Sequence, residues 1–162
     1  MIKGLLFIDV DGTLTDGKIY MGINGEIMKA FSVKDGCGIQ RIVDGSIALP
    51  IVITGRESKI VENRCKELEV CNCIQGAKDK ASVIKEYEKL FPGCPLAYIG
   101  DDLNDIDAME YVKSRNGVTA CPSDACKNVQ DIVDYVCKNI GGNGAVREFI
   151  DYLYNSIKSV FN

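Results

Sequence analysis

The chain contains 162 residues, which is enough for one hydrophobic core and short for two, so we expect residues 1–162 to form a single domain. Its 46% hydrophobic and 26% charged residues exclude an intrinsically disordered protein, and its net charge of −4 argues against a nucleic-acid partner, which needs clustered Lys and Arg. No apolar run approaches the roughly 20 residues that cross a bilayer, and the N-terminus does not resemble a signal peptide, so we expect a cytoplasmic protein with no membrane partner.

The amino-acid inventory restricts the kind of catalyst. The sequence contains no His, so any catalyst must be built from Asp, Lys, Thr, Ser or Cys. Among its eight Cys, Cys71 and Cys73 are the closest pair, but no second pair matches them as a zinc site requires. We therefore expect thiols rather than a zinc site or a disulfide framework.

The first predicted strand covers residues 4–8 and leads directly into Asp9-Val10-Asp11-Gly12-Thr13. A short, continuous apolar run is typical of a central parallel strand, and ligands of open α/β sheets bind at the carboxyl ends of such strands. Asp9 and Asp11 are two residues apart on an extended chain and project to the same side, so one can attack a substrate while the other handles protons. The alternative is a strand followed by an ordinary Asp-Gly turn.

Residues 18–31 interrupt the α/β pattern. Two strand-like stretches, 18–21 and 26–31, flank Asn24-Gly25, which favours a tight turn, so we expect a β-hairpin inserted after the first strand. The insert is too short to be a separate domain. Its apolar side chains must be covered either by a partner subunit or by the protein's own sheet. These side chains are Ile19, Met21, Ile27 and Met28.

The second predicted strand, residues 49–53, ends at Thr54-Gly55, where a hydroxyl and a backbone N–H can hold a phosphate oxygen. A Thr-Gly strand end is common and has little meaning by itself. Lys80 begins a later predicted helix, where its charge could neutralise a phosphoryl group. Alternatively, Lys80 belongs to a solvated helix face.

The third predicted strand, residues 95–99, precedes an acidic cluster of Asp101, Asp102 and Asp105. Carboxylates suit a hard cation such as Mg²⁺. Taken alone, the cluster could instead be a helix N-cap whose acids complement the helix dipole. However, two acidic clusters at two strand ends would repel each other strongly unless a metal ion lay between them, so we predict a metal site there.

Strands that alternate with helices predict an α/β fold, with a Rossmann-like parallel sheet flanked by helices. Apolar residues at three- and four-residue spacing mark the helices. A flexible turn is expected at Gly141-Gly142-Asn143-Gly144, before the last helix. The predicted helices are residues 58–68, 80–90, 105–113 and about 145–159.

Four motifs follow one another along the chain: Asp9-Val10-Asp11-Gly12-Thr13, Thr54-Gly55, Lys80 and the acidic cluster of Asp101, Asp102 and Asp105. In this order they resemble the motifs of the haloacid dehalogenase (HAD) superfamily, and the resemblance covers nearly the whole chain. It implies that Asp9 attacks phosphorus, and that Asp11 protonates the leaving oxygen and later activates water. It also implies that Thr54 and Lys80 bind the phosphoryl group.

The same resemblance implies a Mg²⁺ cofactor. Its ligands would be Asp9, the Asp11 carbonyl and Asp101, supported by the neighbouring acids Asp102 and Asp105.

Further segments resemble a HAD subgroup that lacks a cap domain and includes phosphatases of 3-deoxy-D-manno-octulosonate (KDO) 8-phosphate and of sialate-type 9-phosphates. The resemblance implies a homotetramer in which hairpins assemble and a neighbouring subunit covers the site. It also implies a phosphorylated sugar acid as substrate. The segments are Asp16-Gly17, Phe31-Ser32-Val33-Lys34-Asp35-Gly36, Gly55-Arg56-Glu57-Ser58, Asn63-Arg64-Cys65 and Gly142-Asn143-Gly144-Ala145-Val146-Arg147-Glu148.

Binding an anionic sugar acid needs cations and polar groups beyond Lys80, and Arg56 resembles the octulosonate enzymes at a position where sialate-type enzymes carry Glu. Thr13 and Gln40 depart from the octulosonate pattern, which usually has Val and a basic residue there. The residues expected to bind substrate are Lys34, Asp35 and Gly36 in the loop after the hairpin, together with Gly55, Arg56, Arg64 and Arg147.

The alternative for Arg64 and Arg147 is that they pair with Glu62 and Glu148 on exposed helix faces.

We expect hydrolysis of KDO 8-phosphate, with a sialate-type 9-phosphate as the alternative substrate. From other classes, a receiver-like signalling domain also combines acids, a Thr and a Lys around Mg²⁺, but it carries its phosphate-accepting Asp on a later strand. A catalytically silent assembly domain is disfavoured because the acids and Lys80 are intact.

Overall fold

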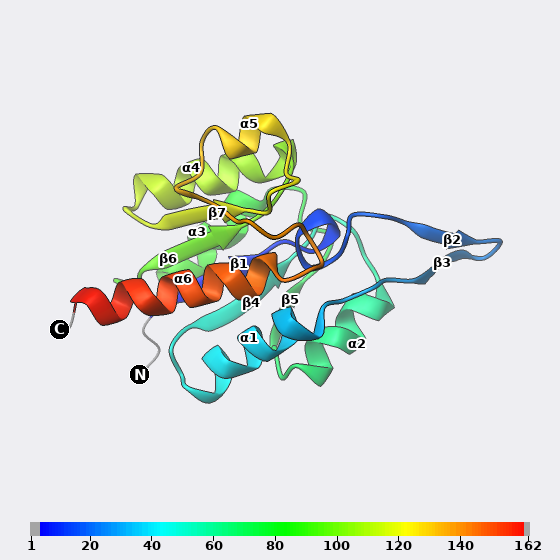
Figure 1. The fold of residues 1–162 in the computed structure, drawn as a ribbon, viewed down its shortest axis with the longest axis horizontal. Helices are drawn as coiled ribbons and strands as arrows, with labels where there is room; N and C mark the ends of the chain where they lie inside the picture. The colour runs from blue at the N-terminus through cyan, green and yellow to red at the C-terminus, as the bar shows by residue number, and fades with distance from the viewer. Residues whose placement is uncertain (1–3, 161–162) are drawn as a thin grey trace.

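The computed structural model describes residues 4–160, and the side chains of residues 4–156. Six parallel strands form the main sheet, in the spatial order β5-β4-β1-β6-β7-β8 (Figure 1). The α/β prediction is confirmed, although three of these strands were not predicted. The strands are β1 Leu5–Ile8, β4 Leu49–Ile53, β5 Asn72–Ile74, β6 Leu96–Ile99, β7 Val118–Cys121 and β8 Tyr135–Val136.

The position of β1 sets the position of the site. β1 pairs in register with β4 on one side and with β6 on the other, so Ile8 is opposite both Val52 and Ile99. Because all three strands are parallel, their carboxyl ends lie next to one another at one edge of the sheet. The residues that follow these three strands are therefore brought together.

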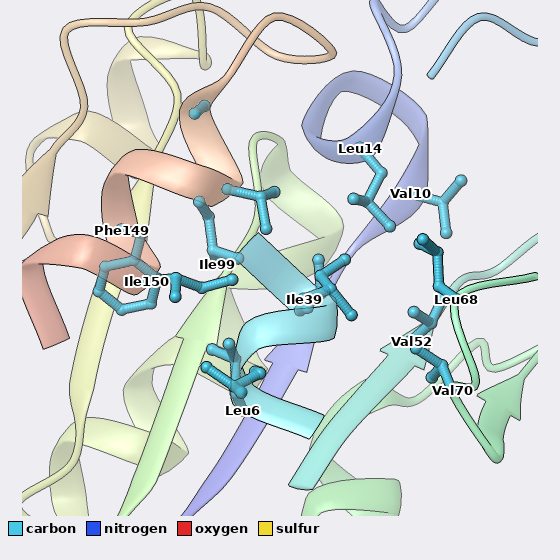
Figure 2. Close-up of a cluster of buried hydrophobic side chains, with 14 of the residues drawn as sticks. Leu6, Val10, Leu14, Ile39, Val52, Leu68, Val70, Ile99, Phe149 and Ile150 are labelled. Atoms are coloured by element: carbon cyan, nitrogen blue, oxygen red, sulfur yellow. The ribbon is translucent and has the colours of Figure 1, made fainter. Parts of the chain in front are cut away.

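Helices cover both faces of the sheet, and the side chains of β1 alternate between two cores. Leu6 and Ile8 face the first core, whereas Leu5 and Phe7 face the second. Figure 2 shows the first core, where Ile39 and Phe149 approach the sheet from different helices. The first face carries α1 Val33–Asp44, α2 Lys59–Glu67 and α6 Ala145–Val160, and the second carries α3 Lys80–Leu90, α4 Ile106–Ser114 and α5 Lys127–Gln130.

Helix α1 lies where a loop was predicted, so that part of the prediction is wrong. Gly36 and Gly38 lie near its start, and Gly is a poor helix former. The structure explains them by close packing. A Cβ atom on Gly36 would lie 2.4 Å from the Arg64 guanidinium of α2, and one on Gly38 would lie 2.9 Å from Arg147 of α6. Tertiary contacts therefore outweigh the local preference.

The hairpin is confirmed. It forms a separate two-stranded antiparallel sheet, β2 Tyr20–Gly22 and β3 Gly25–Met28, which projects from the body of the protein (Figure 1). Gly22 pairs with Gly25, so the turn is centred on residues 23–24, one residue earlier than predicted. Since the hairpin has its own sheet, it does not fold back as a strand of the main one.

The glycine-rich turn before α6 is packed against the loop that follows β1, although it was predicted to be flexible. Gly141 is buried, and a Cβ atom there would lie 1.9 Å from the carbonyl oxygen of Gly12. In residues 4–160, no helix combines the length and apolar character that spanning a membrane requires.

Candidate active site

The end of β1 presents the two acids of the first motif. Asp9 directly follows the strand, and its backbone N–H donates to the carbonyl of Ile99 in β6 at 3.0 Å. The chain then closes a tight loop over residues 10–14 in which Gly12 has a φ of +93°. A Cβ atom on Gly12 would lie 2.0 Å from Asp101 Oδ2, so only Gly lets the loop approach this carboxylate. Asp9 is buried, whereas Asp11 is partly exposed.

Lys80 at the start of α3 connects two of the acids. Its Nζ lies 2.6 Å from Asp9 Oδ1 and 2.6 Å from Asp105 Oδ1, and all three side chains are buried. Burial disfavours the charged amine, but the charges of Asp9 and Asp105 outweigh burial and raise the pKa of Lys80. The lysine is therefore a fixed cation, and the alternative of a solvated helix face is wrong.

The loop after β6 gives its three acids different surroundings. Asp105 is fully buried and its two oxygens are occupied, because they accept hydrogen bonds from Lys80, the Tyr98 hydroxyl at 2.6 Å, and the backbone N–H groups of Asp101 and Asp102. Asp102 is exposed and caps the next turn by accepting from the Leu103 N–H at 2.8 Å. The helix-cap alternative therefore describes Asp102.

Asp9 and Asp101 fit the donor set of a hard cation. One carboxylate oxygen each from Asp9, Asp101 and Asp105 lies within 4.8 Å of the others. Burial and the charge of Asp105 raise the pKa of Asp9 well above its ordinary value, and the same two causes raise the pKa of Asp101 to about 6. Because the oxygens of Asp105 are already occupied, the oxygen donors of Asp9 and Asp101 are the ones left for Mg²⁺.

The end of β4 adds a hydroxyl group next to this cluster. Thr54 is buried, and its Oγ1 accepts a hydrogen bond from the backbone N–H of Arg56 at 3.2 Å. This contact leaves the Thr54 O–H proton available as a donor. Gly55 is exposed beside it. The half-exposed Arg56 guanidinium lies 3.9 Å from Asp11 Oδ2 through its Nε.

Sequence reasoning missed several polar residues that contact the predicted ones. The most prominent is Lys29, a buried cation that directly follows β3 and pairs with Asp11. The available cue was a single charge within the otherwise apolar stretch 27–31. The residues missed are Thr13, Glu26, Lys29, Ser58 and Tyr98.

Two of the predicted substrate-binding residues, Asp35 and Gly36, are buried in contacts between helices. Asp35 is buried, and its carboxylate accepts hydrogen bonds from the backbone N–H groups of Gly144 at 3.1 Å and Arg147 at 2.8 Å, which caps the start of α6. Gly36 is buried in the contact between α1 and α2. We therefore do not propose either as a substrate contact. Lys34 is exposed on the first turn of α1.

The structure does not bring the two helical arginines to the acids. Arg64 pairs with Glu67 at 2.9 Å, and Arg147 pairs with Asp151 at 2.8 Å, in each case along the same helix. The alternative that they pair with acids on their own helices was therefore right in kind, although the partners differ from those expected and the Arg64 side chain is only 17% exposed.

The chain is similar to known phosphatases over most of its length. It is 43% identical over 151 residues to the 3-deoxy-D-manno-octulosonate 8-phosphate phosphatase of Escherichia coli (strain K12), which covers 92% of this chain and 78% of that protein. No protein-family model matches the chain.

The chain is also similar in structure to solved phosphatases and hydrolases. The crystal structure of the phosphatase of the same name from Moraxella catarrhalis, in complex with a magnesium ion, a phosphate ion and a KDO molecule, superposes with a TM-score of 0.85 at 35% identity. The match covers 99% of this chain and 94% of the Moraxella chain. A HAD superfamily (subfamily III A) hydrolase from Legionella pneumophila superposes with a TM-score of 0.86 at 33% identity, covering 95% of this chain and 82% of that one.

Proposed function

The chain belongs to the KDO 8-phosphate phosphatase family of the HAD superfamily, and from this premise we propose that Asp9 is the nucleophile with which it hydrolyses KDO 8-phosphate. The protein is a Mg²⁺-dependent phosphomonoesterase. The observation that carries the assignment of the nucleophile is the position of the Lys80 ammonium, 2.6 Å from Asp9, whose carboxylate lies in one cluster with that of Asp101. A carboxylate, a cation and a metal ligand thus meet at one point, as phosphoryl transfer requires.

In the first step, a carboxylate oxygen of Asp9 forms a bond to phosphorus while the bond from phosphorus to the sugar oxygen breaks. Asp11 donates its proton to the departing oxygen, so the sugar leaves as a neutral alcohol. Lys80 and the Thr54 hydroxyl hold the phosphoryl oxygens. When bound by Asp9, the Asp11 carbonyl and Asp101, Mg²⁺ supplies positive charge that offsets repulsion between the substrate and the carboxylates.

In the second step, water attacks the phosphorus of the aspartyl-phosphate. Asp11 is now a carboxylate and accepts a proton from this water, so phosphate leaves and Asp9 is regenerated. Asp105 keeps Lys80 in place throughout, since its oxygens are fixed by Tyr98 and by two backbone N–H groups.

Arg56 is the cation that we propose for recognition of the sugar acid. It is half exposed, and it lies close to both Asp11 and Glu26, whose Oε1 is 3.8 Å from its Nη2. This position leaves the guanidinium facing open space next to the proton donor, where the substrate carboxylate could bind it bidentately.

We expect KDO 8-phosphate to be hydrolysed with a higher kcat/KM than sialate-type 9-phosphates, and Arg56→Ala to lower kcat/KM for KDO 8-phosphate about tenfold or more. The measurement is steady-state kinetics with both substrates. Arg115→Ala is the matched control, because Arg115 is equally exposed and pairs with Glu88 elsewhere on the surface. A preference for a 9-phosphate, or unaltered kinetics of Arg56→Ala, would contradict this substrate assignment.

We also propose that one domain forms the subunit and that four subunits assemble through their hairpins. The support is the exposure of apolar side chains on the hairpin, which reaches 62% for Met21 and 64% for Ile27. Apolar strands this open are usually buried by a partner.

Light scattering at micromolar concentration should therefore give the mass of a tetramer. Ile27→Lys should lower this mass, because it places a charge in the shared apolar surface. Leu90→Lys should not, because Leu90 is as exposed as Ile27 but lies at the end of α3. A wild-type protein that is monomeric and fully active would refute the tetramer.

A further inference from the structure

Lys29 is a buried cation that the proposed chemistry does not use. Its side chain is 1% exposed and its Nζ contacts two carboxylates, donating to Asp11 Oδ1 and lying 2.9 Å from Glu26 Oε1. Burial opposes its charge, but the contacts with the Asp11 and Glu26 carboxylates outweigh burial and raise the pKa of Lys29. The group is therefore a permanent cation in a position where an unpaired charge would be costly.

The partners of Lys29 are themselves held in place. The second carboxylate oxygen of Glu26 accepts a hydrogen bond at 2.6 Å from the hydroxyl of Ser58, the residue before α2. Thus a strand of the hairpin, the residue that precedes α2 and the loop after β1 meet at one cation. This arrangement holds Lys29 through a second carboxylate, that of Glu26, in addition to Asp11.

The contact also makes the two oxygens of Asp11 different. Oδ1 is occupied by Lys29, whereas among the described residues Oδ2 has only the Arg56 guanidinium within ion-pair distance, at 3.9 Å. Arg56 is half exposed, so Oδ2 is on the open side of the carboxyl group. A proton on Oδ2 could therefore be delivered to a substrate without breaking the contact with Lys29.

We propose that Lys29 is a positioning residue for Asp11, one that holds Oδ1 so that Oδ2 transfers the proton. This inference rests on the proposed function, in which Asp11 protonates the leaving oxygen. Lys29 itself touches neither the substrate nor the phosphorus. The alternative is that Lys29 only fastens the hairpin to the body of the protein.

Leaving groups of different acidity separate these roles. Benzyl phosphate releases an alcohol and needs a proton donor, whereas p-nitrophenyl phosphate releases a stable anion and does not. We expect Lys29→Met to lower kcat/KM about 30-fold or more for benzyl phosphate and less than about threefold for p-nitrophenyl phosphate, within the range of general acid catalysis. Lys29→Arg, which keeps the cation, should recover most of the loss. Lys127→Met, which removes an exposed lysine on α5 that pairs with Asp131, is the control.

A double-mutant cycle provides the second test. In the Asp11→Asn background no proton is left to position, so Lys29→Met should change kcat/KM for benzyl phosphate less than about twofold further. Glu26→Gln, which keeps Lys29 but weakens its support, should show the same leaving-group dependence to a smaller extent, and it carries the test if Lys29→Met does not fold.

Equal losses for the two substrates, or losses that add to those of Asp11→Asn, would overturn the proposal in favour of a purely structural role. A wild-type protein that hydrolyses neither phosphate would instead refute the phosphatase function itself.

Discussion

Asp9→Asn is expected to lower kcat by about 10⁴-fold or more while the protein remains folded, because the neutral amide cannot form the aspartyl-phosphate. The substitution preserves size, and it removes a buried carboxyl group whose pKa is raised by burial and by Asp105. Lys80 retains Asp105 as a partner at 2.6 Å. We therefore expect a melting temperature close to that of the wild type, measured without Mg²⁺.

The covalent intermediate gives a more direct readout than the rate. After a rapid acid quench during turnover, mass spectrometry should find phosphate on the peptide that contains Asp9 in the wild type and none in Asp9→Asn. Asp131→Asn is the matched control, because Asp131 is an exposed carboxylate just beyond the end of α5 that pairs with Lys127, and it should leave turnover unchanged. Near-normal turnover by a folded Asp9→Asn protein would refute the mechanism.

The parts of the fold that could be predicted from sequence are those with a strong local pattern. β4 and α3 were predicted with their observed bounds, since a buried apolar run and a regular helical spacing each identify an element without tertiary information. Helix α1 was missed because its sequence contains Gly36 and Gly38, which are poor helix formers but allow α1 to pack closely against α2 and α6. β5 and β8 were missed because strands of three and two residues are too short to show a period.

The candidate site likewise contains residues that a local sequence pattern predicts and residues whose position depends on tertiary structure. Asp9, Thr54 and Asp101 follow parallel neighbouring strands, so the strand pattern alone predicts that they lie together. Lys29 reaches Asp11 because the hairpin returns to the body, and no local pattern indicates where a hairpin returns. Asp35 was assigned to substrate binding because its segment was taken for a loop, whereas in a helix it faces the start of α6.

Asp101→Asn is expected to raise the Mg²⁺ concentration needed for half-maximal activity by about 100-fold, because it replaces an anionic ligand by a neutral amide. Asn is preferable to Ala, because the buried Thr13 hydroxyl donates to Asp101 Oδ1 at 3.3 Å and Ala would leave it without an acceptor. Asp107→Asn, at an exposed acid on the first turn of α4, is the control. Activity that is insensitive to chelation in the wild type would contradict the metal role.

Asp101→Asn should also affect stability: although it weakens Mg²⁺ binding, it should not destabilise the metal-free protein. The pKa of Asp101 is about 6 in the metal-free protein because of burial and the charge of Asp105, against about 3.9 in an unfolded chain. A carboxyl group whose pKa is raised by folding destabilises the fold in full above the raised pKa, and this penalty shrinks as the pH falls from about 6 toward the unfolded value of about 3.9. Metal-free Asp101→Asn should therefore melt at or above the wild-type temperature at pH 7.5, with a smaller difference at pH 5.

Mg²⁺ reverses the order of stability. The ion stabilises the folded state that binds it, so saturating Mg²⁺ at pH 7.5 should raise the melting temperature of the wild type more than that of Asp101→Asn. In the wild type this gain should shrink as the pH falls through about 6, because protons then compete with the ion for Asp101. If Asp101→Asn melts several degrees below the wild type without Mg²⁺ and gains as much from the ion, Asp101 supports the fold and does not hold the metal.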